Sequence, residues 1–167
     1  MTISCETMQR PDRSFLFAHP SHFLACGLGS GLSPWAPGTV GTLFAWAMYL
    51  LIKPQFSDGA FLVFLAVAFA IGVLACDRTG RDLGVPDHGS IVWDEIVPFW
   101  LVLLLTPPSL SWQAAAFLLF RAFDIVKPPP ANWIDARMKN GLGVMLDDLV
   151  AAGFTVLALA VLVRMLG

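Results

Sequence analysis

Five apolar runs separated by short polar stretches dominate the chain. The runs lie at about residues 39–52, 59–76, 91–105, 112–126 and 144–163, so each has roughly 14 to 20 residues. A straight helix needs about 20 residues to cross a bilayer, so some runs must extend into their flanks or fall short of crossing. Lipid offers the backbone no hydrogen-bond partners, and the runs do not alternate as barrel strands do. The pattern therefore predicts an all-α, polytopic membrane bundle with about five apolar helices.

The segments before these runs have a different character. Residues 1–13 are polar and predict a frayed tail, so the single helical domain should span 14–167. Residues 14–26 are too short to cross and favour an amphipathic piece at the membrane interface. Five Gly and two Pro within 26–42 disfavour a regular helix, so this segment is expected to be a loop that feeds the first run.

Composition supports a membrane protein. Hydrophobic residues make up 57% of the 167 residues and charged residues only 13%, whereas soluble proteins average about 25% charged. The net charge of −2 without a basic run gives no support for a nucleic-acid partner. Three cysteines, Cys5, Cys26 and Cys76, follow no paired or metal-ligand spacing, so reduced structural thiols are expected.

Positive charges predict the orientation in the membrane. With five crossings, seven Lys and Arg residues fall on one side: Arg10, Arg13, Arg78, Arg81, Lys127, Arg137 and Lys139. Only Lys53 and Arg164 fall on the other. Cytoplasmic loops carry the excess of Lys and Arg, so the first side is expected to be cytoplasmic. Most of the acids, and the glycine-rich loop, come to the same face.

Two pairs of adjacent acids are the leading candidates for chemistry. Asp94 and Glu95 begin the third apolar run, and Asp147 and Asp148 begin the fifth. Neighbours on a helix project about 100 degrees apart, so one acid of each pair can point into the bundle. Hard carboxylate oxygens near a phosphate suit Mg²⁺. The alternative is that these acids are solvated groups in the first turn of each helix, where acids are favoured.

Phosphate-binding candidates surround these acids. Arg121 and Asp124 share one helix face, and Lys127 begins the exit from that helix before Pro128 to Pro130. An internal Arg–Asp ion pair is the alternative reading of the first two. The further candidates are polar groups in the glycine-rich loop and one loop histidine: Ser30, Ser33, Thr39, Thr42 and His88. No P-loop pattern and no cysteine, aspartyl or histidine phosphatase motif is present, which leaves metal-assisted attack by water.

Four segments together resemble one family. They are GLGSGLSPWAPGTVGT, DLGVPDHGSIVWDE, FRAFDIVKPPP and GLGVMLDDLVAAG, in that order. This arrangement resembles the bacterial phosphatidylglycerophosphatase A family over about residues 20–155. The resemblance implies a Mg²⁺-dependent enzyme of the cytoplasmic membrane that hydrolyses the terminal phosphate of phosphatidylglycerophosphate to give phosphatidylglycerol. Pro98 departs from the family, which usually has Gly there, and a proline inside the third run should disturb the helix just after its acids.

The resemblance also implies a set of catalytic residues by position: Asp94, Glu95, Asp124, Lys127, Asp147 and Asp148. We expect Asp94, Glu95, Asp147 and Asp148 to hold Mg²⁺ at the cytoplasmic face, where the phospholipid head group can reach it. Lys127, Arg121, His88 and the loop hydroxyls would bind the phosphate. Gly153 in the last run permits the close helix contact of a homo-oligomer without requiring it.

Two other classes of protein remain as alternatives. Asp135, Arg137, Gly141 and Asp147 loosely match the motif of lipid phosphotransferases of the CDP-alcohol type. That match fails in detail, because no Gly follows Asp135 and the later acids are adjacent instead of four apart. A non-enzymatic membrane carrier or assembly subunit is the third possibility.

Overall fold

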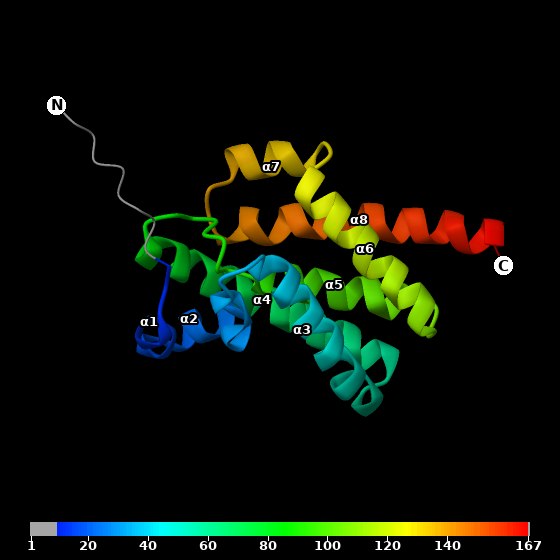
Figure 1. Ribbon diagram of the computed structural model, residues 1–167, viewed down its shortest axis with the longest axis horizontal. Coiled ribbons are helices and arrows are strands. Elements are labelled where there is room, and N and C mark those ends of the chain that lie inside the picture. Colours follow the sequence, from blue (N-terminus) through cyan, green and yellow to red (C-terminus); the bar gives the residue numbers. More distant parts are fainter. Residues whose placement is uncertain (1–9, 167) are drawn as a thin grey trace.

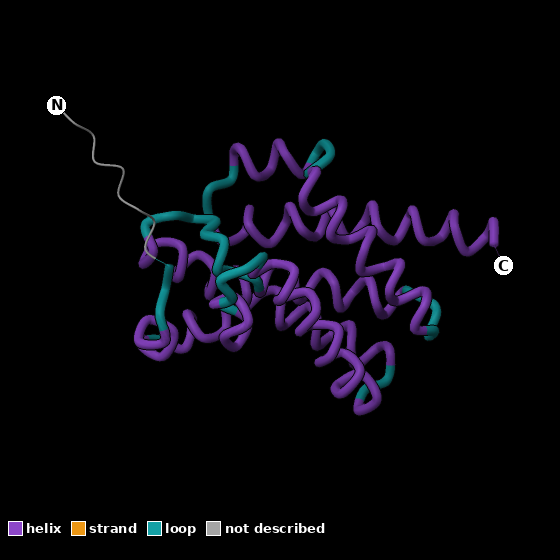
Figure 2. The backbone as a smooth tube through the Cα atoms, in the orientation of Figure 1, coloured by secondary structure: helices purple, strands orange, loops and turns teal. Residues whose placement is uncertain are grey.

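The chain folds into helices joined by short loops. The computed structural model describes residues 10–166, and no strand occurs within that range (Figures 1 and 2). The all-α prediction is therefore confirmed for the described residues. The elements, in order, are α1 (Arg13–Ala18), α2 (Pro20–Ala25), the 3-10 helix η1 (Gly27–Leu32), α3 (Pro37–Ile52), the 3-10 helix η2 (Lys53–Gln55), α4 (Asp58–Leu83), α5 (Trp93–Leu105), α6 (Leu110–Val126), α7 (Ala131–Arg137) and α8 (Gly141–Leu166).

Each of the five apolar runs forms a helix, namely α3, α4, α5, α6 and α8. Several of these helices begin at a polar cap. Ser57 accepts a hydrogen bond from the Ala60 amide at the start of α4, and the Asn140 side chain accepts one from the Gly143 amide at the start of α8. The short helix α7 was not predicted, because seven residues are too few to establish an apolar period.

Only two of these helices are long enough to cross a membrane unaided. Helices α4 and α8 have 26 residues each and are strongly apolar. At 1.5 Å per residue each is about 39 Å long, which exceeds the roughly 30 Å hydrocarbon layer. Helices α3, α5 and α6 have 16, 13 and 17 residues, about 20 to 26 Å. The expected count of about five spanning helices is thus supported by length for two.

Helix α5 forms the centre of the bundle, in contact with α3, α4, α6 and α8. Two of its tryptophans donate hydrogen bonds to carbonyls of neighbouring helices. Trp93 Nε1 lies 3.1 Å from the Ala68 oxygen of α4, and Trp100 Nε1 lies 2.7 Å from the Ala45 oxygen of α3. A buried indole that finds its acceptor holds adjacent helices in register, so α5 is fixed between its neighbours.

The outer surface of the bundle is strongly apolar. On α4, Val63 is 65% exposed and Leu74 is 72% exposed, and on α6 and α8 the exposed apolar residues include Leu118 and Leu157. Soluble monomers rarely expose apolar side chains along several helices at once. This surface, together with the two long helices, indicates a membrane protein.

The N-terminal segment packs against the bundle more closely than a purely interfacial piece would. Helix α2 contacts α4, and the buried His22 lies with Nε2 2.8 Å from Asp82 Oδ2 and Nδ1 3.0 Å from the Phe15 carbonyl. The predicted tail of 1–13 lies mostly outside the described residues, and α1 already begins at Arg13. Cys26 and Cys76 are free and buried, as expected, whereas Cys5 lies outside the described residues.

Candidate active site

A cavity of about 250 Å³ lies at the end of the bundle where α5 and α8 begin and α6 ends. Its walls come from the connection between α4 and α5 and from these three helices. All six residues that the sequence predicted as catalytic line it, together with Asp87, Gly89, Ile91 and Ile125. The structure therefore brings together groups that are far apart in the chain, such as Asp94 and Asp148, which are 54 positions apart.

The antiparallel contact between α4 and α8 carries the second acid pair into the cavity. The amide of Gly141 donates a hydrogen bond of 3.1 Å to Asp77 Oδ1 of α4. A Cβ on Gly141 would lie only 2.0 Å from the Val73 carbonyl oxygen, so the first residue of α8 has to be glycine for this approach. Asp147 and Asp148 follow two turns later, and each is 3% exposed.

The two acids of α8 have different surroundings. Asp147 is satisfied at both oxygens, since Oδ1 accepts from the Asp148 amide at 3.0 Å and Oδ2 accepts from Lys127 Nζ at 2.6 Å. The Asp148 carboxyl has no cationic partner among the described residues. One acid is therefore paired with a cation of the protein and the other is not.

The first acid pair divides in the same way. Asp94, at the start of α5, is 5% exposed, and its Oδ1 has no hydrogen-bond partner within residues 10–166. Pro98 lies inside α5, as the sequence indicates, and because it lacks an N–H the Asp94 carbonyl receives no helical hydrogen bond. Asp94 thus lines the cavity and has one buried oxygen without a partner.

Glu95 instead belongs to an ionic network within the protein. Arg121 Nη1 of α6 donates to Glu95 Oε2 and to Asp124 Oδ2, and the Thr42 hydroxyl lies 2.7 Å from Glu95 Oε2. Gly38 of α3 closes the network, because a Cβ there would lie 2.0 Å from Glu95 Oε1. The internal Arg–Asp pair, which the sequence offered as an alternative to phosphate binding, is therefore present and includes Glu95 as well.

Lys127 ends α6 and reaches across to α8. Burial alone would lower the pKa of its ammonium group, but the hydrogen bond and charge of Asp147 and the charge of Asp87 raise that pKa above its ordinary value. Lys127 is consequently a permanent cation at neutral pH. Its side chain is 26% exposed, so the ammonium group is accessible from the cavity.

The glycine-rich loop and His88 lie beside the cavity and do not line it. The Ser30 and Ser33 hydroxyls donate to the carbonyls of Gly27 and Trp35, both at 2.8 Å, and so stabilise the loop itself. His88 is 7% exposed, and its Nδ1 accepts from the Ser90 amide at 3.1 Å.

Burial lowers the pKa of His88, against the opposing charge of Asp87, and so favours the neutral ring. Phosphate binding by Ser30, Ser33, Thr39, Thr42, His88 and Arg121 stays a prediction, and within the network Thr42 and Arg121 contact Glu95.

Sequence reasoning missed three residues of this region. Asp87 lines the cavity, Asp135 of α7 approaches Lys127, and Gly38 accommodates Glu95. Asp87 lies within a segment that carries the family resemblance, and Asp135 lies in the loosely matched phosphotransferase motif, but neither was assigned to this site. Gly38 is one of 14 glycines and lies in the glycine-rich segment, but no residue near it in the sequence indicates its contact with Glu95.

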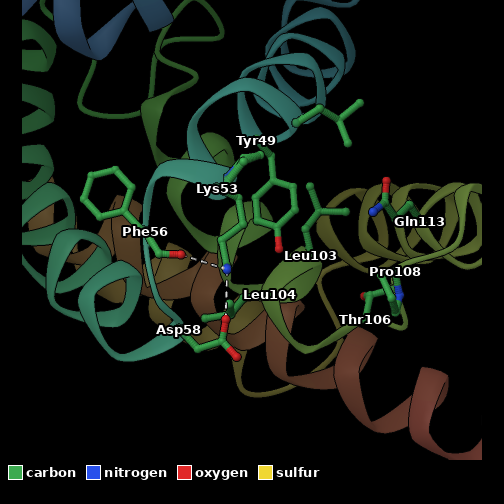
Figure 3. Close-up of a pocket in the computed structure, with 11 residues that line it drawn as sticks. Tyr49, Lys53, Phe56, Asp58, Leu103, Leu104, Thr106, Pro108 and Gln113 are labelled. Carbon is green, nitrogen blue, oxygen red and sulfur yellow. Dashed lines mark hydrogen bonds and ion pairs between the residues drawn. The ribbon is translucent and has the colours of Figure 1, made fainter.

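A larger cavity of about 570 Å³ lies near the end of α3 and the starts of α4 and α6 (Figure 3). There Lys53 Nζ lies 2.8 Å from Asp58 Oδ1 and donates to the Phe56 carbonyl at 3.3 Å, while Gln113 lies on the far side. This cavity contains one acid, already paired. It therefore lacks the concentration of carboxylates found at the other site.

The charge balance of the smaller cavity is its main electrostatic feature. Six carboxyl groups line it, from Asp87, Asp94, Glu95, Asp124, Asp147 and Asp148, and among residues 10–166 the cations in contact with them are Lys127 and Arg121. Buried carboxylates persist when they are paired, protonated or bound to metal. The donor set consists of hard oxygens and one of them is unpartnered, so these residues fit a divalent cation such as Mg²⁺.

The fold and the cavity define a class, a helical membrane protein with a carboxylate-rich site at the ends of its helices. Comparison with known proteins identifies the family within that class. Residues 23–163 match the model of the family described as phosphatidylglycerophosphatase A. The chain belongs to the phosphatidylglycerophosphatase A family, and it is therefore a phosphatase.

Individual relatives agree with this assignment. The chain is 44% identical over 153 residues to phosphatidylglycerophosphatase A of Haemophilus influenzae, which covers 90% of this chain and 93% of that protein. It is 44% identical over 138 residues to phosphatidylglycerophosphatase A of Escherichia coli, covering 80% and 78% of the two chains. A protein of Bacteroides thetaiotaomicron named putative phosphatidylinositol-3-phosphatase is 37% identical over 148 residues, covering 83% and 90%. No solved structure matches the chain.

Proposed function

We propose that this protein is a Mg²⁺-dependent phosphatase that hydrolyses the terminal phosphomonoester of phosphatidylglycerophosphate to give phosphatidylglycerol and phosphate. The observation that carries the proposal is the convergence of six carboxyl groups and Lys127 in one cavity of a protein of this family. The names of the Haemophilus influenzae and Escherichia coli relatives supply the substrate. Family membership argues against the phosphotransferase and carrier alternatives.

The carboxyl groups of the cavity would have two different roles, ion pairing within the protein and binding of Mg²⁺. Glu95 and Asp124 are paired with Arg121, and Asp147 is paired with Lys127. Asp94 and Asp148 would therefore be the principal residues that hold Mg²⁺, fewer than the four ligands that the sequence predicts. A bound Mg²⁺ would supply Lewis acidity that offsets the charge of the phosphoryl group and makes water more acidic.

The protein's own groups would position the reactants. Lys127 would donate hydrogen bonds to the phosphate oxygens of the substrate, because only one of its three N–H groups is used in a hydrogen bond to the described part of the protein. A carboxylate of the cavity would accept the proton of the attacking water. The water oxygen bonds to phosphorus as the bond from phosphorus to the glycerol oxygen breaks, and the released alkoxide takes up a proton.

We further propose a location in the bacterial cytoplasmic membrane, with several apolar helices embedded and the cavity facing the cytoplasm. The antiparallel arrangement of α4 and α8 supports it, because the end of α4 that carries Arg78 and Arg81 lies beside the start of α8. A cavity at the cytoplasmic face of the membrane would let the acyl chains of the substrate remain in the bilayer while its head group reaches the carboxylates. The protein would then act on lipid of the cytoplasmic leaflet.

The test is release of inorganic phosphate from phosphatidylglycerophosphate by purified protein in detergent, with Mg²⁺ and with EDTA. We expect release that requires Mg²⁺ and that is abolished by Asp94→Asn and by Asp148→Asn. Asp58→Asn, the same change in the larger cavity, is the matched control and should retain wild-type activity. Near-normal turnover in both site variants would exclude the proposed metal site.

One relative gives a reason to test a second lipid head group as substrate. The Bacteroides thetaiotaomicron relative is named for a phosphoinositide, so phosphatidylinositol 3-phosphate belongs in the same assay. We expect faster hydrolysis of phosphatidylglycerophosphate, which two relatives at 44% identity support. Faster hydrolysis of the phosphoinositide would transfer the proposal to that substrate.

A further inference from the structure

The ammonium group of Lys127 lies among three carboxylates from three separate elements. Its Nζ is 2.6 Å from Asp147 Oδ2 of α8, 3.6 Å from Asp135 Oδ1 of α7 and 3.7 Å from Asp87 Oδ2 of the connection between α4 and α5. One oxygen from each of these acids lies within 4.8 Å of the others. Figure 1 shows how this is possible, because α7 lies beside the first half of α8.

The backbone of Lys127 is held at the end of α6, but its side chain needs external support. Lys127 has φ 45° and ψ 64°, a left-handed conformation, and its amide donates to the Phe123 carbonyl at 2.8 Å. A lysine has four flexible carbons between this anchored backbone and its charge, so its position in a site depends on what surrounds the ammonium group. The three carboxylates supply those surroundings.

We propose that Asp87 and Asp135 are positioning residues, which together with Asp147 hold the Lys127 ammonium at the edge of the cavity to receive the substrate phosphate. This inference rests on the proposed function and extends it to two acids that were not among the predicted site residues. Only the contact with Asp147 is a hydrogen bond, so two N–H groups of Lys127 remain for phosphate oxygens. We name these three acids the lysine cage.

Three carboxylates this close could in other proteins bind a metal, but here the cation among them is Lys127. Asp147 has no free oxygen, because the Asp148 amide and Lys127 occupy both. The unpartnered carboxylate oxygen of the cavity belongs to Asp94, outside the cage. Metal binding and lysine positioning are thus assigned to different acids of the same cavity.

Kinetics and metal binding together test this assignment. We would measure kcat and KM for phosphatidylglycerophosphate, and Mn²⁺ affinity by electron paramagnetic resonance, in Asp87→Asn and Asp135→Asn. Loss of one partly exposed ionic contact changes an equilibrium by about two- to five-fold, so we expect KM to rise by that factor in each variant with kcat nearly unchanged. Mn²⁺ affinity should stay at the wild-type value, whereas Asp148→Asn should lose Mn²⁺ binding.

Two further variants separate positioning from a general structural effect. Asp135→Glu keeps the charge and should restore most of the affinity for substrate. In a Lys127→Ala background, Asp135→Asn should change KM no further, because both substitutions then act through the same ammonium group. Lys139→Ala is the matched control and should leave KM unchanged. Lys139 contacts Asp135 at 3.5 Å from outside the cage, and its side chain is 55% exposed.

Two results would overturn the inference. A fall in Mn²⁺ affinity in Asp87→Asn or Asp135→Asn as large as that in Asp148→Asn would make the cage a metal site. A KM unchanged in both variants, or an equal effect of Asp135→Asn with and without Lys127, would exclude positioning. Failure of the proposed function shows differently, as an absence of phosphate release by the wild-type protein itself.

Discussion

The contact between Gly38 and Glu95 makes a specific prediction about how α3 supports the site. Gly38 is the second residue of α3, and an alanine Cβ there would lie 2.0 Å from Glu95 Oε1 and 2.9 Å from its Cδ. Real Cβ atoms do not approach other atoms so closely, so the Glu95 carboxylate must move. That movement disturbs its contacts with Arg121 and Thr42, both of which are inside the bundle.

The loss of stability expected for Gly38→Ala follows from the packing around Glu95. Adding a methylene group to a filled interior destabilises a protein by about 1 to 3 kcal/mol. For a chain of this length, 1 kcal/mol corresponds to a shift of about 2 to 4 °C in the unfolding midpoint. We therefore expect Gly38→Ala to lower the apparent Tm in detergent by about 2 to 12 °C, and to reduce kcat because Glu95 is adjacent to Asp94.

Gly59→Ala is the matched control for this experiment. Gly59 is also the second residue of its helix, α4, and an added Cβ would meet no atom within 4 Å. Alanine is the better helix former, so this variant should be unchanged or slightly more stable. Glu95→Asp should partly rescue Gly38→Ala, because the shorter side chain leaves room for the methyl group. A Gly38→Ala protein with the Tm and kcat of the Gly59→Ala protein would refute the contact.

Three other predictions test the network, the membrane orientation and the start of α8. Thr42→Val removes a hydroxyl that lies 2.7 Å from Glu95 Oε2. Loss of a hydrogen bond to a charged group should destabilise the protein by about 1.5 to 3 kcal/mol and so lower the apparent Tm. An unchanged Tm would contradict this contribution of Thr42. In a cysteine-free background, Gln55→Cys and Arg81→Cys should react with a membrane-impermeant maleimide from opposite sides, because α4 lies between them; labelling from one side would exclude a crossing α4. Asp77→Ala removes the acceptor of the first α8 amide and should lower the Tm by about 2 to 4 °C, whereas an unaltered Tm would show that α8 does not need it.

The structure places the four adjacent acids in the predicted site but gives the two members of each pair different roles. In each adjacent pair, one acid is satisfied within the protein and the other lacks a cationic partner among residues 10–166. Glu95 and Asp147 contact Arg121 and Lys127, whereas Asp94 and Asp148 do not. Adjacent residues on a helix point in directions about 100 degrees apart, so each pair can contribute one acid to an internal ion pair and one to a ligand.

Much of this protein follows from its sequence. Long apolar runs have few stable alternatives to helices in lipid, so the positions of α3, α4, α5, α6 and α8 could be predicted. The adjacent acids at the starts of two runs, and Lys127 before its prolines, also marked the candidate site. These features are local, and a local pattern is sufficient to reveal them.

Other features depend on tertiary structure. Whether Glu95 binds a metal or Arg121 depends on how α5 and α6 pack, and the roles of Gly38 and Asp135 depend on the approach of α3 and α7. Helix lengths also differ from run lengths, since α4 extends through Leu83, beyond the run that ends near residue 76, whereas α5 begins only at Trp93. Charges interact over a few ångströms in space, whereas a sequence gives only distances along the chain. The sequence alone therefore determined which groups the site contains, and the packing of the helices decided which of them pair with each other.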